Sequence, residues 1–225
     1  MICVMVRPRQ PILTQARIVD VATSIIDREG LEALSTRRLA AELAVRAPSL
    51  YNHFRTKEEI LDAVGEAIIA GVDISMFGRL EWPEALRTWA RGYRAALAAH
   101  PHIVPFLARG PGRRPAALAL ADAVYGGLVD AGWPPAQATR IGALMRYLVT
   151  GSTLGSFAQG FVDDPTFYAE RYPHLTDAHR LREHSRRVDD GAFELGLETL
   201  IAGLVAQFRE LARPGANPVT RRSRA

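Results

Sequence analysis

Residues 35–59 carry the strongest structural pattern of the chain: Ser-Thr-Arg-Arg-Leu-Ala-Ala-Glu-Leu-Ala-Val-Arg-Ala-Pro-Ser-Leu-Tyr-Asn-His-Phe-Arg-Thr-Lys-Glu-Glu. The spacing of its apolar residues predicts two short helices, over residues 36–43 and 47–53, joined by the turn 44–46. The inner faces of these helices would bury Leu39, Ala40, Leu43, Val45, Leu50 and Phe54. Donor side chains remain on the outer face of the second helix. This layout is typical of a helix-turn-helix that reads duplex DNA.

On both sides of this helix pair, the start and stop signals in the sequence predict an all-α protein. A first helix is predicted over residues 14–28, with Gly30 as its C-terminal stop. Thr56 and Glu59 form a capping box that opens a longer helix towards Gly71. No alternating apolar pattern bounded by hairpin turns is present, so strands are not expected.

The second half of the chain is expected to be helical as well. Residues 160–189 are rich in Asp, Pro, His and Arg and predict a loop with one or two short helices. The longer predicted helices cover residues 83–100, 115–131, 135–159 and 191–212.

Residues 13–64 resemble the N-terminal domain of the tetracycline-repressor (TetR) family of bacterial transcription regulators. The matching pieces are residues 17–22, 29–37, 50–54 and 57–61. Residues 82–100 and 193–204 resemble the C-terminal domain of the tetracycline repressor itself, and residues 101–189 match only loosely. The resemblance implies a three-helix helix-turn-helix DNA-binding domain followed by a helical bundle for ligand binding and dimerisation.

The expected domain organisation has four parts. Residues 1–12 would form a flexible arm, 13–75 the DNA-binding domain, 76–213 the ligand-binding and dimerisation domain, and 214–225 a disordered basic tail. Arg7 and Arg9 in the arm could reach DNA, although a flexible tail is the simpler interpretation.

The composition fits a soluble, intracellular protein. Hydrophobic residues make up 48% and charged residues 23%, and the net charge of +4 permits nucleic-acid binding without requiring it. Cys3 is the only cysteine, which excludes an internal disulfide and suits a reducing compartment. Residues 1–6 are too short for a secretory core, and no apolar run is expected to span a membrane. We therefore expect a cytoplasmic protein without a membrane partner.

Two candidate DNA contacts follow from side-chain chemistry. Asn52 can both donate to and accept from a base edge, and Arg37 can pair with guanine through two hydrogen bonds. The resemblance adds Lys57, at the start of the next helix, as a phosphate contact. The full set of expected DNA-binding residues is Thr36, Arg37, Arg46, Ala47, Pro48, Ser49, Tyr51, Asn52, His53 and Lys57.

Some of these residues also have structural interpretations. Tyr51 could be a packing residue, His53 a structural histidine, and Arg37 with Arg38 a solvated face. Arg46 stands where the family usually has a hydroxyl cap, and its side chain cannot accept a backbone N–H. Base reading would then depend heavily on Arg37 and Asn52.

The C-terminal domain is expected to bind a small molecule. Its candidate ligand-binding residues are Trp89, Tyr93, Phe106, Leu107, Tyr125 and Met145, although each could be ordinary core. By the resemblance, the drug-contacting asparagine and phenylalanine of the tetracycline repressor fall on Trp89 and Tyr93, and its magnesium-binding histidine falls on Leu107. Leucine cannot bind metal, so we expect no metal or other cofactor, and an aromatic or hydrophobic effector other than tetracycline.

The resemblance also implies a homodimer. Small residues near the end of one helix and an apolar stripe on the last helix would form the contact, although the stripe could equally be core in a monomer. The predicted interface residues are Gly151, Gly155, Leu197, Leu200, Ile201 and Leu204. Two recognition helices about 34–36 Å apart would read a palindromic operator.

Other function classes are weaker. The six histidines lack a metal-binding spacing, and no phosphate-binding or nucleophile motif is present, which argues against an enzyme. A DNA-binding protein without small-molecule control would not need so large an apolar C-terminal domain. The favoured function is a ligand-responsive repressor; the alternatives are a DNA-binding protein without small-molecule control and, last, an enzyme, and the sequence does not separate a repressor from an activator.

Overall fold

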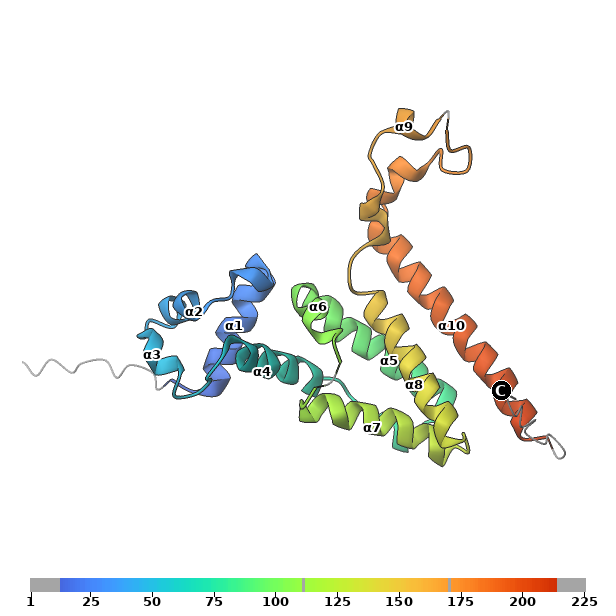
Figure 1. Ribbon diagram of the computed structural model, residues 1–225. Coiled ribbons are helices and arrows are strands. Elements are labelled where there is room, and N and C mark those ends of the chain that lie inside the picture. Colours follow the sequence, from blue (N-terminus) through green and yellow to red (C-terminus); the bar gives the residue numbers. More distant parts are fainter. Residues whose placement is uncertain (1–12, 111, 170, 214–225) are drawn as a thin grey trace, which may run out of the picture.

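The computed structural model describes residues 13–110, 112–169 and 171–213, and within these ranges it is helical without strands, which confirms the predicted all-α class (Figure 1). The expected arm 1–12 and tail 214–225 lie outside the described residues. The helices are α1 (Gln15–Glu29), α2 (Thr36–Glu42), α3 (Ala47–Leu50), α4 (Lys57–Ala70), α5 (Trp82–Ala99), α6 (Val104–Leu107), α7 (Pro115–Asp130), α8 (Pro135–Gly151), α9 (Pro165–Ala169) and α10 (Ser185–Leu211).

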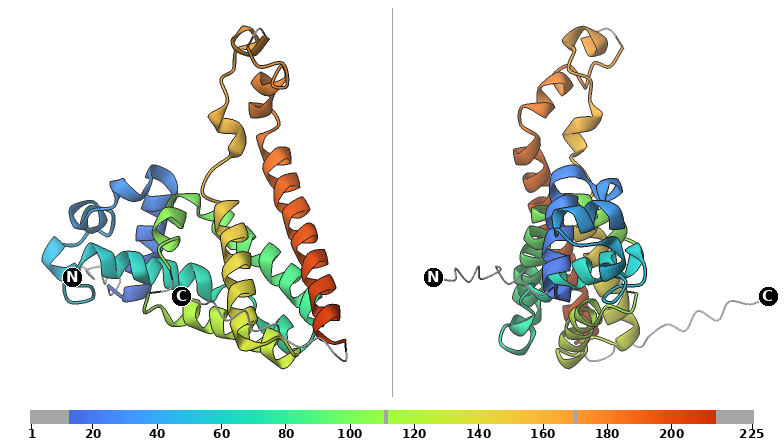
Figure 2. Two further views of the ribbon diagram at one scale, coloured as in Figure 1. Left: turned by 45° about the vertical axis from the view of Figure 1, so that its right-hand side comes forward. Right: turned by 90° about the vertical axis from the view of Figure 1, so that its left-hand side faces the viewer.

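The helices form a small N-terminal unit and a larger bundle, connected by α4. Helices α1 to α3 lie at one side of the molecule, and α4 packs against α1 on one side and α7 on the other (Figure 1). Helix α5 packs against both α8 and α10. Residues 152–169, including α9, and residues 171–184 extend beyond the end of the bundle (Figure 2). Helix α4 therefore touches both halves.

Capping side chains fix the starts of the N-terminal helices. The Thr14 hydroxyl accepts from the Arg17 N–H ahead of α1, and Ser35 does the same for Arg38 ahead of α2. Thr56 accepts from the Glu59 N–H at 3.1 Å, as the capping box predicts. The Glu59 carboxylate accepts from the Arg55 N–H, one residue before the expected partner. Each such cap contributes about 1 kcal/mol to helix stability.

The turn between α2 and α3 forms without glycine. Ala44 has a φ of 55°, in the left-handed region that disfavours a Cβ. Its N–H donates to Ala41 O at 3.1 Å, and the Val45 N–H donates to Ala40 O at 2.9 Å. These two bonds form a Schellman motif, which directs the chain from α2 into α3.

Replacing Ala44 with glycine should raise the free energy of unfolding by about 0.5–1 kcal/mol, because glycine adopts this φ without strain. The matched control is Ala41→Gly in the last turn of α2, which should lower the free energy of unfolding by up to about 1 kcal/mol. Urea unfolding of both variants measures the difference. Equal destabilisation by the two substitutions would show that the turn holds no strain.

Several helix boundaries differ from the predicted ones. Helix α3 ends at Leu50, and residues 51–53 form a turn. Helix α8 ends at Gly151 rather than Gln159, where the Ser152 and Thr153 hydroxyls donate to backbone carbonyls of the last turn. Such bonds compete with continued helix. Helix α10 begins at Ser185, six residues early, and the short helix α6 was not predicted.

Helix α10 corrects the expectation about membrane-length segments. By length and composition it is the one helix of the described chain that could cross a bilayer. Phe193, Leu197, Ile201 and Leu204 of this helix are nevertheless buried in the core of the bundle. Packing within the chain accounts for these four residues, whereas only 22% of the apolar window of α10 is buried.

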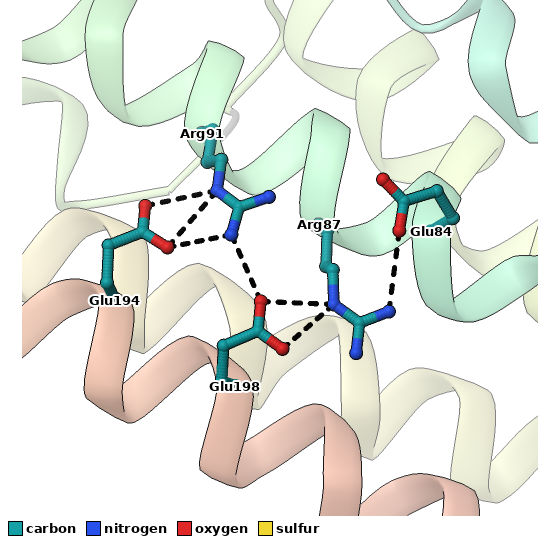
Figure 3. Close-up of polar contacts among 5 residues, drawn as sticks. All are labelled: Glu84, Arg87, Arg91, Glu194 and Glu198. Carbon is teal, nitrogen blue, oxygen red and sulfur yellow. Dashed lines mark hydrogen bonds and ion pairs between the residues drawn. The ribbon is translucent and has the colours of Figure 1, made fainter.

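Ion pairs hold the polar side of α10 against α5. Arg91 donates to Glu194 at 2.7 Å and to Glu198 at 3.0 Å, and Arg87 donates to Glu198 at 3.0 Å (Figure 3). The hydrogen bond from Arg91 lowers the pKa of Glu194. The pairs are solvent-exposed, and exposed pairs of this kind contribute at most about 1 kcal/mol each. Their main effect is to fix the register of the two helices.

Candidate nucleic-acid interface and ligand cavity

Helix α3 presents a polar surface at the end of the molecule opposite α10 (Figure 1). Leu50 and Phe54 are buried, with exposed fractions of 1% and 9%, as the sequence predicts. On the outer side Tyr51 is 53% exposed and Asn52 is exposed. Arg46, Pro48 and Arg37 are also exposed, whereas Thr36, Ala47 and Ser49 are half-buried. The side chains predicted to contact DNA therefore lie around one helix-turn-helix.

Two adjacent arginines of α2 have different surroundings. Arg38 donates to Glu29 at 2.8 Å and lies 3.7 Å from Glu42, which also pairs with Arg28. Arg37 has no ion pair within the described part of the chain and projects into solvent. Arg37 is thus available to an external anion, whereas Arg38 stabilises the contact between α1 and α2.

Side chains that donate to backbone carbonyls hold the residues following α3 against the rest of the N-terminal unit. The His53 carbonyl accepts from Gln15 Nε2 at 3.2 Å, and Lys57 Nζ donates to Leu31 O at 3.3 Å. Lys57 is half-buried by this contact, and its remaining N–H groups can still reach a phosphate. The Arg46 side chain makes no capping bond to α3, which confirms the missing cap predicted from the sequence.

A cavity of about 150 Å³ lies inside the bundle, between α4, α5, α6, α7 and α8. Four of the six predicted ligand residues line it: Trp89, Tyr93, Leu107 and Tyr125. The other two do not. Met145 is fully buried core, and the Phe106 ring packs beneath the Arg114 guanidinium at 5.5 Å. Both belong to the packing behind the cavity wall.

The structure adds lining residues that the sequence interpretation missed, chiefly Arg114, Gly142, Arg146 and Tyr147. A Cβ at Gly142 would overlap the Tyr125 ring, so this glycine allows the ring to lie directly on α8. A signal for Arg146 was present, because it follows Gly142 at i+4 on the buried face of α8. A charged residue on an otherwise buried helical face marks a polar site.

The cavity wall is attached to the N-terminal unit through α4. Arg114, only 6% exposed, donates to Asp62 Oδ1 of α4 at 2.6 Å. The Glu66 carboxylate of α4 accepts from the Ala116 N–H of α7 at 2.9 and 3.0 Å. A Cβ at Gly65 would lie 2.6 Å from Leu107 Cδ2, so α4 and α6 are in close contact. Movement of the cavity wall would therefore act directly on α4.

A second set of contacts joins α1 to the bundle. His100 Nδ1 lies 2.9 Å from Asp27 Oδ2, and His102 Nδ1 lies 2.9 Å from Ile26 O. Both histidines follow α5, and both partners lie near the end of α1. These contacts give two of the six histidines a structural role in joining α1 to the bundle.

The predicted dimer residues need correction. Leu197, Ile201 and Leu204 are 0%, 0% and 5% exposed inside a single chain, so their side chains are core. Leu200 is half-buried, and Gly151 and Gly155 are exposed, with Gly155 outside the helix. The exposed apolar residues lie on other positions, with Leu144 of α8 at 45% and Leu195 of α10 at 71%.

Comparison with known proteins matches both halves of the chain. Residues 18–64 match the family described as "Bacterial regulatory proteins, tetR family", and residues 78–208 match "Tetracyclin repressor-like, C-terminal domain". The chain belongs to the tetR family. As a tetR-family member, it is a transcriptional regulator with a DNA-binding helix-turn-helix domain and a ligand-binding helical domain.

The matches to relatives cover most of this chain and most of each relative. An HTH-type transcriptional regulator of Saccharopolyspora erythraea is 30% identical over 208 residues, which cover 88% of this chain and 86% of that protein. The class C tetracycline repressor protein of Escherichia coli is 32% identical, covering 85% and 90%. The structure of apo ActR from Streptomyces coelicolor has a TM-score of 0.71 and 31% identity, covering 89% and 98%.

Proposed function

We propose that this regulator is a cytoplasmic repressor that binds a palindromic operator as a homodimer and is released by a small aromatic molecule. The observation that carries the proposal is the direct contact of the cavity wall with α4, through Arg114 and Asp62. Related structures hold small molecules, namely ActR in complex with actinorhodin and with (S)-DNPA.

The size of the cavity supports a coupling mechanism. A volume of about 150 Å³ accommodates roughly one aromatic ring, as in engineered cavities that bind benzene. A larger effector must displace the wall formed by Leu107 and Arg114, both of which contact α4. The effector would then favour a conformation in which α4 and the recognition helix are displaced. It shifts the equilibrium only by its preference for that conformation.

The chemistry of the lining argues against tetracycline with magnesium. Leu107 lies at the cavity in the position where the resemblance places the metal-binding histidine. No His, Asp or Glu is among the lining residues in the described part of the chain. Magnesium prefers oxygen ligands, so these lining residues offer it few groups to bind.

The proposed dimer uses the exposed faces of α8 and α10, which lie side by side (Figures 1 and 2). Leu144, Tyr147 and Leu195 supply its apolar surface, and the exposed Gly151 allows close approach. A second copy placed on this face would form a four-helix contact. Such a two-fold arrangement presents two recognition helices to one palindrome.

The proposal is tested by selecting genomic duplexes with the full-length protein and measuring their affinity by fluorescence anisotropy. A selected palindrome should bind at least about 1,000-fold more tightly than random DNA, with affinity falling steeply between about 50 and 200 mM salt. If no genomic duplex competes better than random DNA, the proposal is wrong.

Substitutions in the helix-turn-helix should separate base reading from backbone binding. Arg37→Ala or Asn52→Ala should cost about 1–3 kcal/mol on the preferred site and relax base preference, while Lys57→Ala should weaken all sequences alike. Arg38→Ala is the matched control, because Glu29 and Glu42 already hold that side chain. A change of base preference in the Lys57 variant would contradict the assigned roles.

A further inference from the structure

Two guanidinium groups border the cavity from different elements. Arg114 precedes α7, and Arg146 lies on α8. Arg146 Nη2 donates to Leu107 O at 3.2 Å and Ala108 O at 3.0 Å, which are neutral acceptors. Arg114 binds Asp62 and the Gly110 carbonyl. The cavity therefore brings two positive charges together, and no carboxylate is among its described lining residues.

The charges at the cavity are incompletely balanced. The side chain of Asp62 is 49% exposed, and it neutralises Arg114 from the α4 side rather than from within the cavity. The carbonyl partners of Arg146 carry no net charge. A guanidinium removed from water without a counter-ion is costly, so an anion entering this space would be favoured by both arginines.

Hydrogen-bond donors without partners at the cavity also favour a ligand that brings acceptor atoms. The buried Arg114 Nε and Trp89 Nε1 have no hydrogen-bond partner among the described residues. Burial raises the pKa of the Tyr93 hydroxyl, although the charges of Arg146 and Arg114 partly oppose that effect. Tyr93 thus stays protonated at neutral pH and can act as a donor. A ligand that fits this site brings acceptor atoms.

We propose that the effector is an aromatic acid whose carboxylate binds Arg146 and Arg114 while its ring lies against Trp89 and Tyr125. Planar guanidinium groups match a carboxylate through paired hydrogen bonds, and aromatic side chains favour a flat ring system. A carboxylate at Arg114 also competes with Asp62 for the same guanidinium. Occupation of the cavity would thereby weaken the link between α7 and α4. This last step rests on the proposed function, whereas the charge preference does not.

The test compares acids with their neutral amides on the full-length protein. Benzoate, 2-naphthoate and anthracene-2-carboxylate are titrated beside the corresponding primary amides by isothermal calorimetry. At least one acid should bind about ten-fold or more tightly than its amide, because only the acid supplies a charge to the arginines. Failure of every acid to bind, or equal affinities within each pair, would overturn the proposal. This comparison needs no variant to fold.

Variants then assign the preference to the cavity. Arg146→Met should reduce the acid-to-amide ratio to about two or less, and Arg146→Lys should retain part of it, since lysine keeps the charge but loses the paired geometry. The matched control is Arg140→Met, an exposed arginine of the same helix outside the cavity, which should keep the full ratio. Equal losses in the Arg146→Met and Arg140→Met variants would show that net charge alone attracts the acids.

Release of the operator distinguishes the two proposals. If acids bind with the expected preference but leave operator binding unchanged, the effector-controlled function fails and the charge preference stands. If neutral aromatics release the operator as well as acids do, the function stands and the aromatic-acid proposal fails.

Discussion

Replacing Leu195 with aspartate should convert the proposed dimer into monomers and weaken operator binding by at least about 100-fold, because linked half-sites gain two to four orders of magnitude in affinity. Leu195 is 71% exposed on α10, the most exposed of the large apolar side chains among the described residues. Burying such a leucine contributes about 1.5–3 kcal/mol, and a two-fold interface contains the substitution twice. An aspartate in the same contact would be buried without a partner.

The matched control for the dimer is Leu118→Asp on α7. Leu118 is 48% exposed, and it lies outside the proposed faces of α8 and α10. Its variant should remain dimeric and retain operator affinity. Sedimentation velocity measures the mass, and anisotropy measures the binding. A Leu195→Asp protein that still sediments as a dimer would place the interface elsewhere.

The N-terminal fold was predictable because local signals agree with one another there. The apolar spacing of residues 36–54, the Thr14, Ser35 and Thr56 caps and the stop at Gly30 each indicate the observed helices. The turn at Ala44 was located correctly, although its left-handed backbone was not predicted. Alanine carries no sequence signal for positive φ, and only the two bonds of the Schellman motif reveal it.

The stripe on α10 shows where a periodic pattern becomes ambiguous. Helical spacing identified Leu197, Ile201 and Leu204 as one apolar face but could not tell whether it meets the same chain or another copy. In the structure that face packs into the bundle, and the exposed residue Leu195 lies off the stripe. The spacing of apolar residues predicts that this face of the helix is buried. Only the packed structure shows whether it is buried against the same chain or against a second copy.

The residues that line the cavity were predicted only in part, because a sequence pattern does not show which helices meet. Aromatic residues such as Trp89 and Tyr125 are ordinary candidates for an apolar site, and they do line it. Arg114 and Arg146 were missed, because arginine is usually exposed and neither lies in a recognisable motif. The spacing of Arg146 from Gly142 on α8 was a signal that the sequence analysis did not use, whereas the meeting of Arg114 with Arg146 depends on the approach of α7 and α8 around a shared space.

The bond between Arg114 and Asp62 should make the two single substitutions very unequal. Asp62→Ala should lower the free energy of unfolding by about 3 kcal/mol, because it leaves a buried guanidinium without its counter-ion. Arg114→Met should cost only about 1 kcal/mol, since methionine fills the space beside Phe106. The remaining Asp62 is half-exposed and can be solvated by water.

The double variant Asp62→Ala/Arg114→Met is the decisive measurement, by urea unfolding of all four proteins. Once the guanidinium is absent, losing the carboxylate leaves no buried charge unpaired, so the double variant should be more stable than Asp62→Ala alone. Additive losses would mean that Arg114 is solvated through the cavity and needs no counter-ion. The expected non-additivity would instead establish that the charge in the cavity wall is balanced from α4. Under the proposed mechanism, an anion entering the cavity would act on the DNA-binding domain through this bond.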